Sequence, residues 1–362
     1  MSDSAPLLDS TAPAAPRRRK AATIRDVAVA AGVSTATVSK FINGGQRFTR
    51  EVEERLTQVI RELGYVSNPM ARGMITGQTG NVGIVILDIL NPHFTSLVKG
   101  ASRVARQAGL NLLFTDVAEG EMPELDMLQA LSRRVDGLIV SARLSDASRE
   151  WLTHCGVPVV YYGGAEEHAG SWSVSVDNRL AASMLGRHLR ELGHRRITYV
   201  GFRAARWSVE RWEGLCEVFA GSDAELTLAD VDAPVAEEGE RIASAILLGA
   251  QPPDAVVAYN DLIALGLMSQ AQCLGLRIPA DLSVASFDNI LYSRYVHPAL
   301  TTVDMASEPT GAVVMERLVE RIRAGSLPGD PPSDPAGRHE TLPPRVMARA
   351  STAAHRSRDA MP

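Results

Sequence analysis

The sequence lacks the features that mark membrane and secreted proteins. Among its 362 residues, no apolar run approaches the roughly 20 residues that a membrane-spanning helix needs. The N-terminal segment contains no apolar stretch long enough for a secretory signal. The three cysteines, Cys155, Cys216 and Cys273, are too few and too widely spaced for a disulfide framework. We therefore expect a cytoplasmic protein with no membrane association.

Common enzyme motifs are missing as well. The chain contains no GxSxG, HExxH or GxxxxGKS/T motif, and no GxGxxG follows a predicted strand. Its eight histidines are scattered, and none is paired at the spacing of metal ligands. The sequence therefore predicts neither catalysis nor a bound metal or other cofactor.

The formal net charge of -5 hides an asymmetry along the chain. Residues 17–80 hold eleven basic and five acidic side chains, a net charge of +6, so the remainder carries -11. A basic module on an acidic body suggests a polyanionic partner for one end only. Because four of the eleven positive charges form the run RRRK, charge alone fits a solvated basic tail equally well.

Residues 23–64 are predicted to form three short helices. Thr23, with an acidic residue three positions later, has the pattern of a capping box. Gly32 ends the first helix, and Ser34 and Thr49 can cap the second and third. The first two helices have the spacing of a helix-turn-helix, in which the second helix enters the major groove of DNA. A generic helical bundle would show the same periodicity.

The character of the chain changes at residue 81. Short apolar runs there alternate with amphipathic stretches of helical length, which predicts doubly wound α/β layers. About 270 such residues are too many for one small sheet and indicate two lobes. Residues 1–22 and 353–362 are predicted to be disordered tails. The apolar runs are VGIVIL (82–87), LNLLF (110–114), DGLIV (136–140), VPVVYY (157–162), RITYVG (196–201), AVVAYN (255–260) and SVASFD (283–288).

The stretches TIRDVAVAAGVSTATVSKFIN and TREVEERLTQVIRELGYVSNPMARGM resemble the DNA-binding head and hinge of the lactose/galactose repressor (LacI/GalR) family. The likeness continues through VGIVILDILNPHF, LRELGHRRITYVG, YNDLIALGLM, SVASFDN and HPALTTV, and covers about residues 23–350. It implies a dimeric transcription regulator with an all-α helix-turn-helix head, a hinge helix and a two-lobed α/β core of the periplasmic-binding-protein kind.

The resemblance also implies domain limits. These are a head at 23–66, a hinge helix and linker at 67–80, and an effector-binding core at 81–352. Within the core, lobe 1 comprises about 81–175 and 305–334, and lobe 2 about 176–304 and 335–352.

By the resemblance, Thr35, Ala36 and Lys40 face base edges, and Arg47 also reaches DNA. The methyl group of Ala36 can pack only against a thymine methyl, whereas Lys40 can donate to guanine without the rigid fork of arginine. A further six residues are candidates for phosphate contacts, although a helix cap or a solvated polar group is the alternative for each. They are Ser34, Thr37, Ser39, Asn43, Thr49 and Tyr65.

The hinge is expected to contact the minor groove through Ala71 and Met74. Met74 stands where most relatives place a leucine that is wedged between central base pairs. With Gly73 beside it, so short a helix should form only on DNA. The alternative is an ordinary interdomain linker.

The resemblance places a small molecule between the lobes, gripped by Arg211, Asn260 and Asp288. This trio suits a polyol, because arginine donates, aspartate accepts and asparagine does both. The alternatives are that Arg211 pairs with a neighbouring glutamate and that Asp288 shapes a loop. Candidates that follow other strands, where ligands bind in open α/β sheets, are Asp88, Asn91, His93, Phe94, Ser141 and Arg143, with Asp177 as a weaker one.

The sequence thus predicts a DNA-binding transcription regulator, most simply a repressor of a pseudo-palindromic operator, released by a sugar or sugar derivative. The alternatives are a corepressed or activating regulator that responds to a nucleobase or other metabolite, and a solute-binding protein without a DNA function. The C-terminal segment ASTAAHRSRDAMP lacks the leucine heptad of tetrameric relatives, which favours a homodimer.

Overall fold

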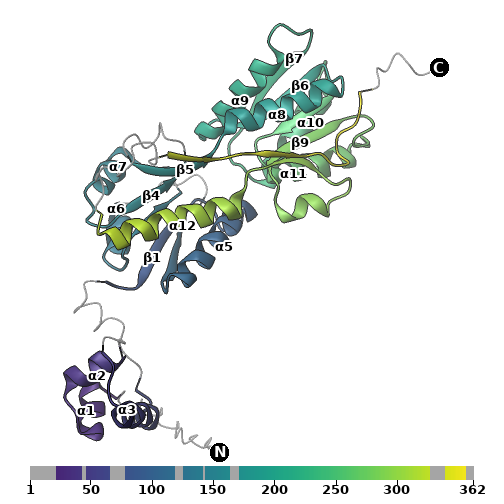
Figure 1. The fold of residues 1–362 in the computed structure, drawn as a ribbon. Helices are drawn as coiled ribbons and strands as arrows, with labels where there is room; N and C mark the ends of the chain where they lie inside the picture. The colour runs from purple at the N-terminus through teal and green to yellow at the C-terminus, as the bar shows by residue number, and fades with distance from the viewer. Residues whose placement is uncertain are drawn as a thin grey trace, which may run out of the picture. The chain divides into compact units, whose positions relative to one another are not determined.

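A computed structural model gives the architecture (Figure 1). The chain divides into two compact units, Met1–Gly77 and Gln78–Pro362, which we call the head unit and the core unit and describe separately. The structure describes residues 22–42, 46–65, 78–118, 125–141, 143–163, 171–326 and 339–355.

The head unit contains three helices, α1 (Ile24–Ala31), α2 (Thr35–Ile42) and α3 (Arg50–Leu63). The predicted capping box is confirmed: the Asp26 amide donates to Thr23 Oγ1 (3.3 Å), and the Thr23 amide donates to the Asp26 carboxylate (2.8 Å). Gly32 ends α1 in the left-handed conformation (φ +66°), where a residue without a Cβ is least strained.

The apolar positions of the three helices meet in one small core. Val27, Val38 and Leu56 are fully buried, and each such side chain contributes about 1.5–3 kcal/mol of burial free energy. The expected side-chain cap at Thr49 is not made, although Thr49 occupies the N-cap position. Instead, the backbone amide of Phe48, which precedes α3, donates to Oε1 of Glu53 in the first turn of that helix (3.2 Å).

The predicted two-lobed α/β architecture is confirmed, and each lobe of the core unit is built on a six-stranded sheet. Sheet A has the strand order β11-β5-β4-β3-β1-β2, and all its neighbouring strands are parallel. Its strands are β1 (Asn81–Ile86), β2 (Asn111–Asp116), β3 (Leu138–Val140), β4 (Val159–Tyr162), β5 (Trp172–Val176) and β11 (His339–Leu342).

Sheet B has the order β12-β10-β9-β8-β6-β7, and only β12 runs antiparallel to its neighbour in the described sheet. Its strands are β6 (Arg196–Phe202), β7 (Glu225–Val231), β8 (Ala255–Ala258), β9 (Ser283–Asp288), β10 (Thr301–Asp304) and β12 (Arg345–Met347).

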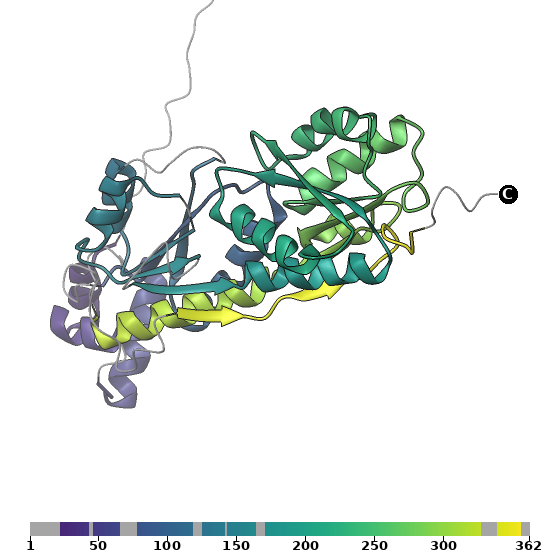
Figure 2. The same cartoon turned by 90° about the horizontal axis from the view of Figure 1, so that it is seen from above.

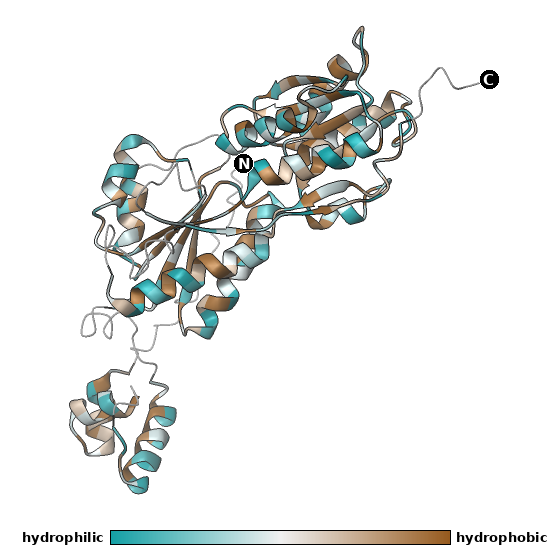
Figure 3. Cartoon of the chain, turned by 45° about the horizontal axis from the view of Figure 1, so that its top comes forward, coloured by the Kyte–Doolittle hydropathy of each residue, from teal (hydrophilic) through white to brown (hydrophobic). Residues whose placement is uncertain are grey.

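Helices cover the sheets and turn their apolar faces toward the strands, which are brown at the centre of each lobe in Figure 3. Within the described residues, no helix is long and apolar enough to cross a membrane. Lobe 1, built on sheet A, carries α5 (Pro92–Gln107), α6 (Leu125–Ser132), α7 (Asp146–Leu152) and α12 (Ser307–Ala324). Lobe 2, built on sheet B, carries α8 (Asn178–Glu191), α9 (Arg206–Phe219), α10 (Ala236–Leu247), α11 (Asp261–Cys273) and the 3-10 turn η1 (Leu291–Arg294).

Helices α5 and α12 approach one another so closely that glycine is required at their crossing. A Cβ on Gly100 would collide with the Glu308 carbonyl, and one on Gly311 would collide with the Leu97 carbonyl. The contact brings α12, which is more than 200 residues away in the sequence, against the first helix of lobe 1.

The chain crosses between the lobes three times, after β5, after β10 and between β11 and β12. The C-terminal crossing is the yellow segment in Figure 2 and contains Pro343 and Pro344. At the crossing after β10, Ala306 is left-handed (φ +48°), a conformation that costs a non-glycine residue about 1 kcal/mol or more. The lobes are therefore joined by three short connections on which they can rotate.

Three boundaries differ from those expected from the sequence. Residues 339–342 were expected in lobe 2 but pair with β5 of sheet A. Gly80 was expected in the linker, but its amide donates to Asp136 of the core (2.8 Å). The tail was expected to be disordered from residue 353, yet the His355 amide donates to the Leu192 carbonyl (2.8 Å). In each case a backbone amide or strand pairing makes long-range hydrogen bonds that fix a segment whose composition looks like a loop.

Candidate functional site

The exposed face of α2 carries the side chains expected to meet DNA bases. Thr35 and Ala36 are exposed in its first turn, and Lys40 is exposed one turn later. The Lys40 ammonium donates to Gln46 Oε1 (3.3 Å), and Arg47 is exposed beside that glutamine. The exposed side of α2 therefore offers a cation, a hydroxyl and a methyl group, and Arg47 adds a second cation after the helix.

The candidates for phosphate contacts have mixed surroundings. Ser34 caps α2, because its hydroxyl accepts the Thr37 amide (3.1 Å) and lies 2.9 Å from Thr37 Oγ1. Thr49 is exposed, whereas Ser39 and Tyr65 are half-buried, Tyr65 against the head core. Asn43, Ala71 and Met74 lie outside the described residues.

The core unit brings six of the predicted effector residues together at the carboxyl ends of the strands. They lie where the two lobes meet and line one small cavity with residues that the sequence did not single out. The predicted members are His93 and Phe94 from lobe 1 and Arg211, Asn260 and Asp288 from lobe 2; Asn91, also a candidate, lines it too. The remaining lining residues are Leu87, Trp207, Pro234 and Tyr259.

Arg211 is held rigidly on α9, with only 2% of its surface exposed. Its guanidinium lies between the rings of Tyr259 (4.8 Å) and Phe287 (4.5 Å). Its Nε donates to Asn178 Oδ1 (3.0 Å), and its Nη1 donates to the Tyr259 carbonyl. These bonds use two of the five N–H donors of the guanidinium, so Arg211 is a preorganised, buried cation at the cavity wall.

Asp288 ends β9 with a strained backbone (φ +110°) and is buried. Burial raises the pKa of its carboxyl to about 7, although the charge of Arg211 acts in the opposite direction. The loop that follows is fixed by Asp261, which accepts the Ile290 amide (2.8 Å) and the Thr302 hydroxyl (2.6 Å). Burial, and then the charge of Asp288, raise the pKa of Asp261 to about 6.

His93 faces Asp288 from the other lobe. Its Nε2 lies 2.9 Å from the Tyr162 hydroxyl, its Nδ1 lies 2.9 Å from Ser307 Oγ, and its Nδ1 lies 3.6 Å from Asp288 Oδ1. Burial, and then the charge of Arg211, lower the pKa of His93 to about 3. The ring is therefore neutral at pH 7, and its contact with Asp288 is neither an ion pair nor a hydrogen bond.

Asn260 and Asp177 act as helix caps. Asn260 Oδ1 accepts the Ile263 amide (2.9 Å) and its Nδ2 donates to the Pro234 carbonyl (2.8 Å). Asp177 accepts the Leu180 amide (2.8 Å), and Asp88 accepts the Leu90 amide (2.7 Å). Asn260 still has one lone pair and one N–H beyond these bonds, whereas Asp88 and Asp177 do not line the cavity.

Ser141 and Arg143 also lie outside the cavity lining, after β3. The Arg143 guanidinium packs over the ring of Phe202 (5.4 Å), so it bridges the two lobes. The Ser141 hydroxyl is buried and has no hydrogen-bond partner among the described residues, a costly state unless another group approaches it.

Two aromatic residues at the site, Trp207 in the cavity lining and Tyr162 against His93, were missed by the sequence analysis. Trp207 of α9 and Tyr162 of β4 meet edge to face across the lobes, with ring centroids 5.3 Å apart. A signal for Trp207 was available, because it precedes Arg211 by four residues and so shares its helix face. Tyr162 offered none, because a tyrosine at the end of a buried strand is an ordinary core residue.

The space left among these side chains is small, about 20 Å³. Such a cavity accommodates about one water molecule, whereas pockets for small organic ligands hold several hundred Å³. The chemistry of a polar site is thus assembled, but the lobes are closed on it.

Comparisons with known proteins agree with this architecture. Residues 23–68 match the family described as bacterial regulatory proteins, lacI family, and residues 187–352 match the periplasmic binding protein-like domain. Catabolite control protein A of Staphylococcus xylosus is 30% identical over 335 residues, which cover 91% of this chain and 99% of that protein.

Two solved structures illustrate the likeness. The lac repressor dimer bound to operator and an anti-inducer superposes with a TM-score of 0.80 at 22% identity, over 92% of this chain and 100% of that one. A regulator from Enterococcus faecium with bound ribose superposes with a TM-score of 0.67 at 27% identity, over 76% and 100%. The chain therefore belongs to the lacI family of bacterial regulatory proteins, and it is a DNA-binding transcription regulator rather than an enzyme.

Proposed function

We propose that the protein is a homodimeric cytoplasmic repressor, associated with the nucleoid when bound to a pseudo-palindromic operator, whose DNA affinity is set by a sugar or sugar derivative held between the lobes. The observation that carries the effector proposal is the convergence of a buried cation, a buried carboxyl and a neutral imidazole from two lobes on one cavity. Buried polar groups of this kind are costly unless they have a partner.

The polar residues match the hydroxyls of a sugar. Arg211 donates from a fixed position, and Asp288 accepts from two hydroxyls when ionised or both donates and accepts when protonated. With a pKa of about 7, both forms of Asp288 are populated near neutrality. Phe94 and Trp207 add apolar surface against which the C–H face of a sugar ring can pack. The related Enterococcus faecium regulator was solved with ribose bound.

The closed cleft suggests how ligand and DNA affinity are linked. A sugar cannot fit in about 20 Å³, so its binding requires the lobes to part about their three connections. A ligand shifts such an equilibrium only to the extent that it prefers the more open arrangement. A coupling of about 1–3 kcal/mol would change DNA affinity about 5- to 150-fold.

On the DNA side, we propose that Thr35, Ala36 and Lys40 contact base edges and that Arg47 also reaches DNA. Exposure of all four side chains supports this role. Phosphate contacts are proposed for Ser34, Thr37, Ser39, Asn43, Thr49 and Tyr65, and minor-groove contacts for Ala71 and Met74.

A thermal-shift screen tests the effector site. Sugars, sugar phosphates and nucleobases are each added to the full chain, and the best stabiliser is repeated on Arg211→Ala and on Arg187→Ala, which removes an exposed arginine from α8. We expect a sugar to stabilise the wild type and the Arg187 variant but not the Arg211 variant. Stabilisation that survives Arg211→Ala would contradict the site, and a nucleobase hit would favour the alternative in which Trp207 and Phe94 stack on a flat ring.

A further inference from the structure

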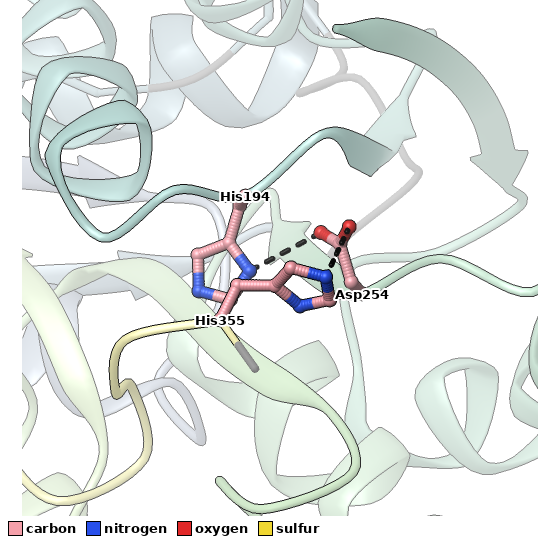
Figure 4. Close-up of side chains that lie close together, drawn as sticks. All are labelled: His194, Asp254 and His355. Atoms are coloured by element: carbon pink, nitrogen blue, oxygen red, sulfur yellow. Dashed lines mark hydrogen bonds and ion pairs between the residues drawn. The ribbon is translucent and has the colours of Figure 1, made fainter. Parts of the chain in front are cut away.

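Three side chains that are far apart in the sequence meet at the amino ends of two strands of sheet B (Figure 4). His194 lies just before β6, Asp254 just before β8, and His355 near the C-terminus. The effector cavity lies at the opposite, carboxyl ends of these strands, so the cluster is separate from it. Sequence spacing did not reveal the cluster, because 60 and 101 residues separate its members.

The donor atoms are close enough to share one ion. One nitrogen or oxygen atom from each residue lies within 4.8 Å of the other two. His194 Nδ1 is 3.1 Å from Asp254 Oδ1, and His355 Nε2 is 4.0 Å from Asp254 Oδ2. Ligands of a tetrahedral zinc ion lie about 3.3 Å from one another, given bonds of about 2.0–2.1 Å. The first distance already fits. The second runs to the other carboxylate oxygen, so His355 must move closer for one ion to bind all three residues.

The surroundings of His194 favour a cation beside it. Its Nε2 lies 3.2 Å from the Ala353 carbonyl, so both ring nitrogens face oxygen atoms. A neutral imidazole has one N–H, so the carbonyl contact and the carboxylate contact cannot both be hydrogen bonds. Either an imidazolium, with an N–H on each nitrogen, or a metal ion on Nδ1 satisfies both contacts. With a metal ion on Nδ1, Nε2–H donates to the carbonyl, as the second nitrogen of a metal-bound histidine usually does.

Asp254 is held in place in a similar way. Its Oδ2 accepts the backbone amides of Arg195 (3.1 Å) and Arg196 (3.0 Å), which orient the carboxylate toward the two histidines. Asp254 and His194 are buried, whereas 26% of the His355 side chain is exposed. An ion can therefore enter past His355 and meet two ligands that are already fixed.

We propose that His194, Asp254 and His355 form a site for a transition-metal ion, most favourably Zn²⁺, with a fourth position open to water. Two imidazoles and one carboxylate are a ligand set of Zn²⁺, whereas Mg²⁺ and Ca²⁺ prefer oxygen atoms. The ion would fasten the C-terminal segment to lobe 2, adding to the bonds that Ala353 makes to Ser283 Oγ (3.3 Å) and His355 makes to the Leu192 carbonyl (2.8 Å).

Isothermal titration of the full chain, purified without a histidine tag, tests the proposal. ZnCl₂ is titrated into the wild type, His355→Ala and a control, His154→Ala, which removes an exposed histidine of lobe 1. MgCl₂ serves as the metal control. Because His355 is partly exposed near the chain end, its variant is expected to fold, which circular dichroism checks.

We expect one zinc ion per chain in the wild type and in the His154 variant, and binding at least about tenfold weaker in the His355 variant. Co²⁺ should give the intense visible absorption of a low-symmetry tetrahedral site in the wild type and the His154 variant but not in the His355 variant, and MgCl₂ should give no heat of binding. Equal zinc affinity in all three proteins, or no zinc binding by the wild type at micromolar concentration, would overturn the proposal.

Discussion

At the scale of single residues, folding shifts the pKa values of two groups in the cleft in opposite directions. Folding lowers the pKa of His93 from about 6.5 in the unfolded chain to about 3. The free energy of unfolding therefore decreases as the pH falls from about 6.5 toward 3. Asp288 has a pKa raised to about 7, so stability is lost as the pH rises from about 4 to about 7. The closed cleft should therefore be most stable in mildly acidic solution.

The substitution Asp288→Asn removes one of these two effects. Between pH 5 and pH 8 the wild type loses stability as Asp288 ionises, whereas the amide of the variant cannot ionise. The unfolding free energy of the variant, relative to that of the wild type, should therefore increase by about 1–3 kcal/mol over this range. Urea denaturation at both pH values measures the difference. Asp232→Asn, at a fully exposed carboxyl, is the matched control and should show no such trend. A pH-independent difference for Asp288→Asn would contradict the raised pKa.

Lys40 is the residue whose loss should change sequence preference. We expect Lys40→Ala to weaken binding to a duplex selected by the wild type by about 1–3 kcal/mol and binding to random DNA much less. Arg61→Ala removes the same charge from the last turn of α3 and should weaken both duplexes slightly and equally. Fluorescence anisotropy measures both affinities. If Lys40→Ala weakened binding to both duplexes equally, Lys40 would contact phosphates only and would not read base edges.

The resemblance to a family pointed to Arg211 and Asp288, and the position of His93 after a strand pointed to His93. The structure brings these three side chains to one cavity. Asp88 and Asp177 do not line it, because short polar side chains after strands serve equally well as caps of the next turn or helix. Tyr162 and Tyr259 could not be found, because only tertiary packing turns these strand-end aromatics toward the site.

At the scale of elements, the tightest helix contact gives a sharp prediction. Gly311→Ala should destabilise the core unit by about 2 kcal/mol or more, since its Cβ meets backbone that cannot move without separating α5 from α12. Gly186→Ala on α8 is the control, because the nearest atom there is Leu215 Cδ2 at 3.2 Å, the end of a flexible side chain. Chemical denaturation compares the two, and equal effects would contradict the close packing.

The strands that the sequence analysis found are mostly central ones. A strand buried on both faces of a parallel sheet is a continuous apolar run, as in β1 and β9. Among the strands outside the predicted runs, β7 lies at a sheet edge and alternates between apolar and polar residues, and β11 and β12 are edge strands of four and three residues. The strands β5 and β10 also lie outside those runs, although each has a neighbour on both sides. Their positions depend on backbone pairing with distant segments, which leaves little trace in local composition.

At the scale of the whole molecule, one exposed apolar patch is a candidate for the dimer interface. Leu291, Tyr292 and Tyr295 are 61%, 56% and 78% exposed on the loop after β9, an apolar patch of the kind that pairs with a second copy. Tyr295→Glu should weaken dimerisation at least about tenfold, because it buries a charge. Leu248→Glu, at another exposed apolar residue, is the control. Sedimentation equilibrium measures both, and an unchanged Tyr295→Glu dimer would exclude this surface.

The most direct test of the linkage between cleft and head is the affinity of the full chain for its selected duplex, measured by fluorescence anisotropy with and without a saturating sugar that stabilises the core. The closed, nearly filled cleft predicts that the sugar changes the dissociation constant by about 5- to 150-fold. The same dissociation constant in both titrations, with sugar binding verified in the same buffer, would contradict it.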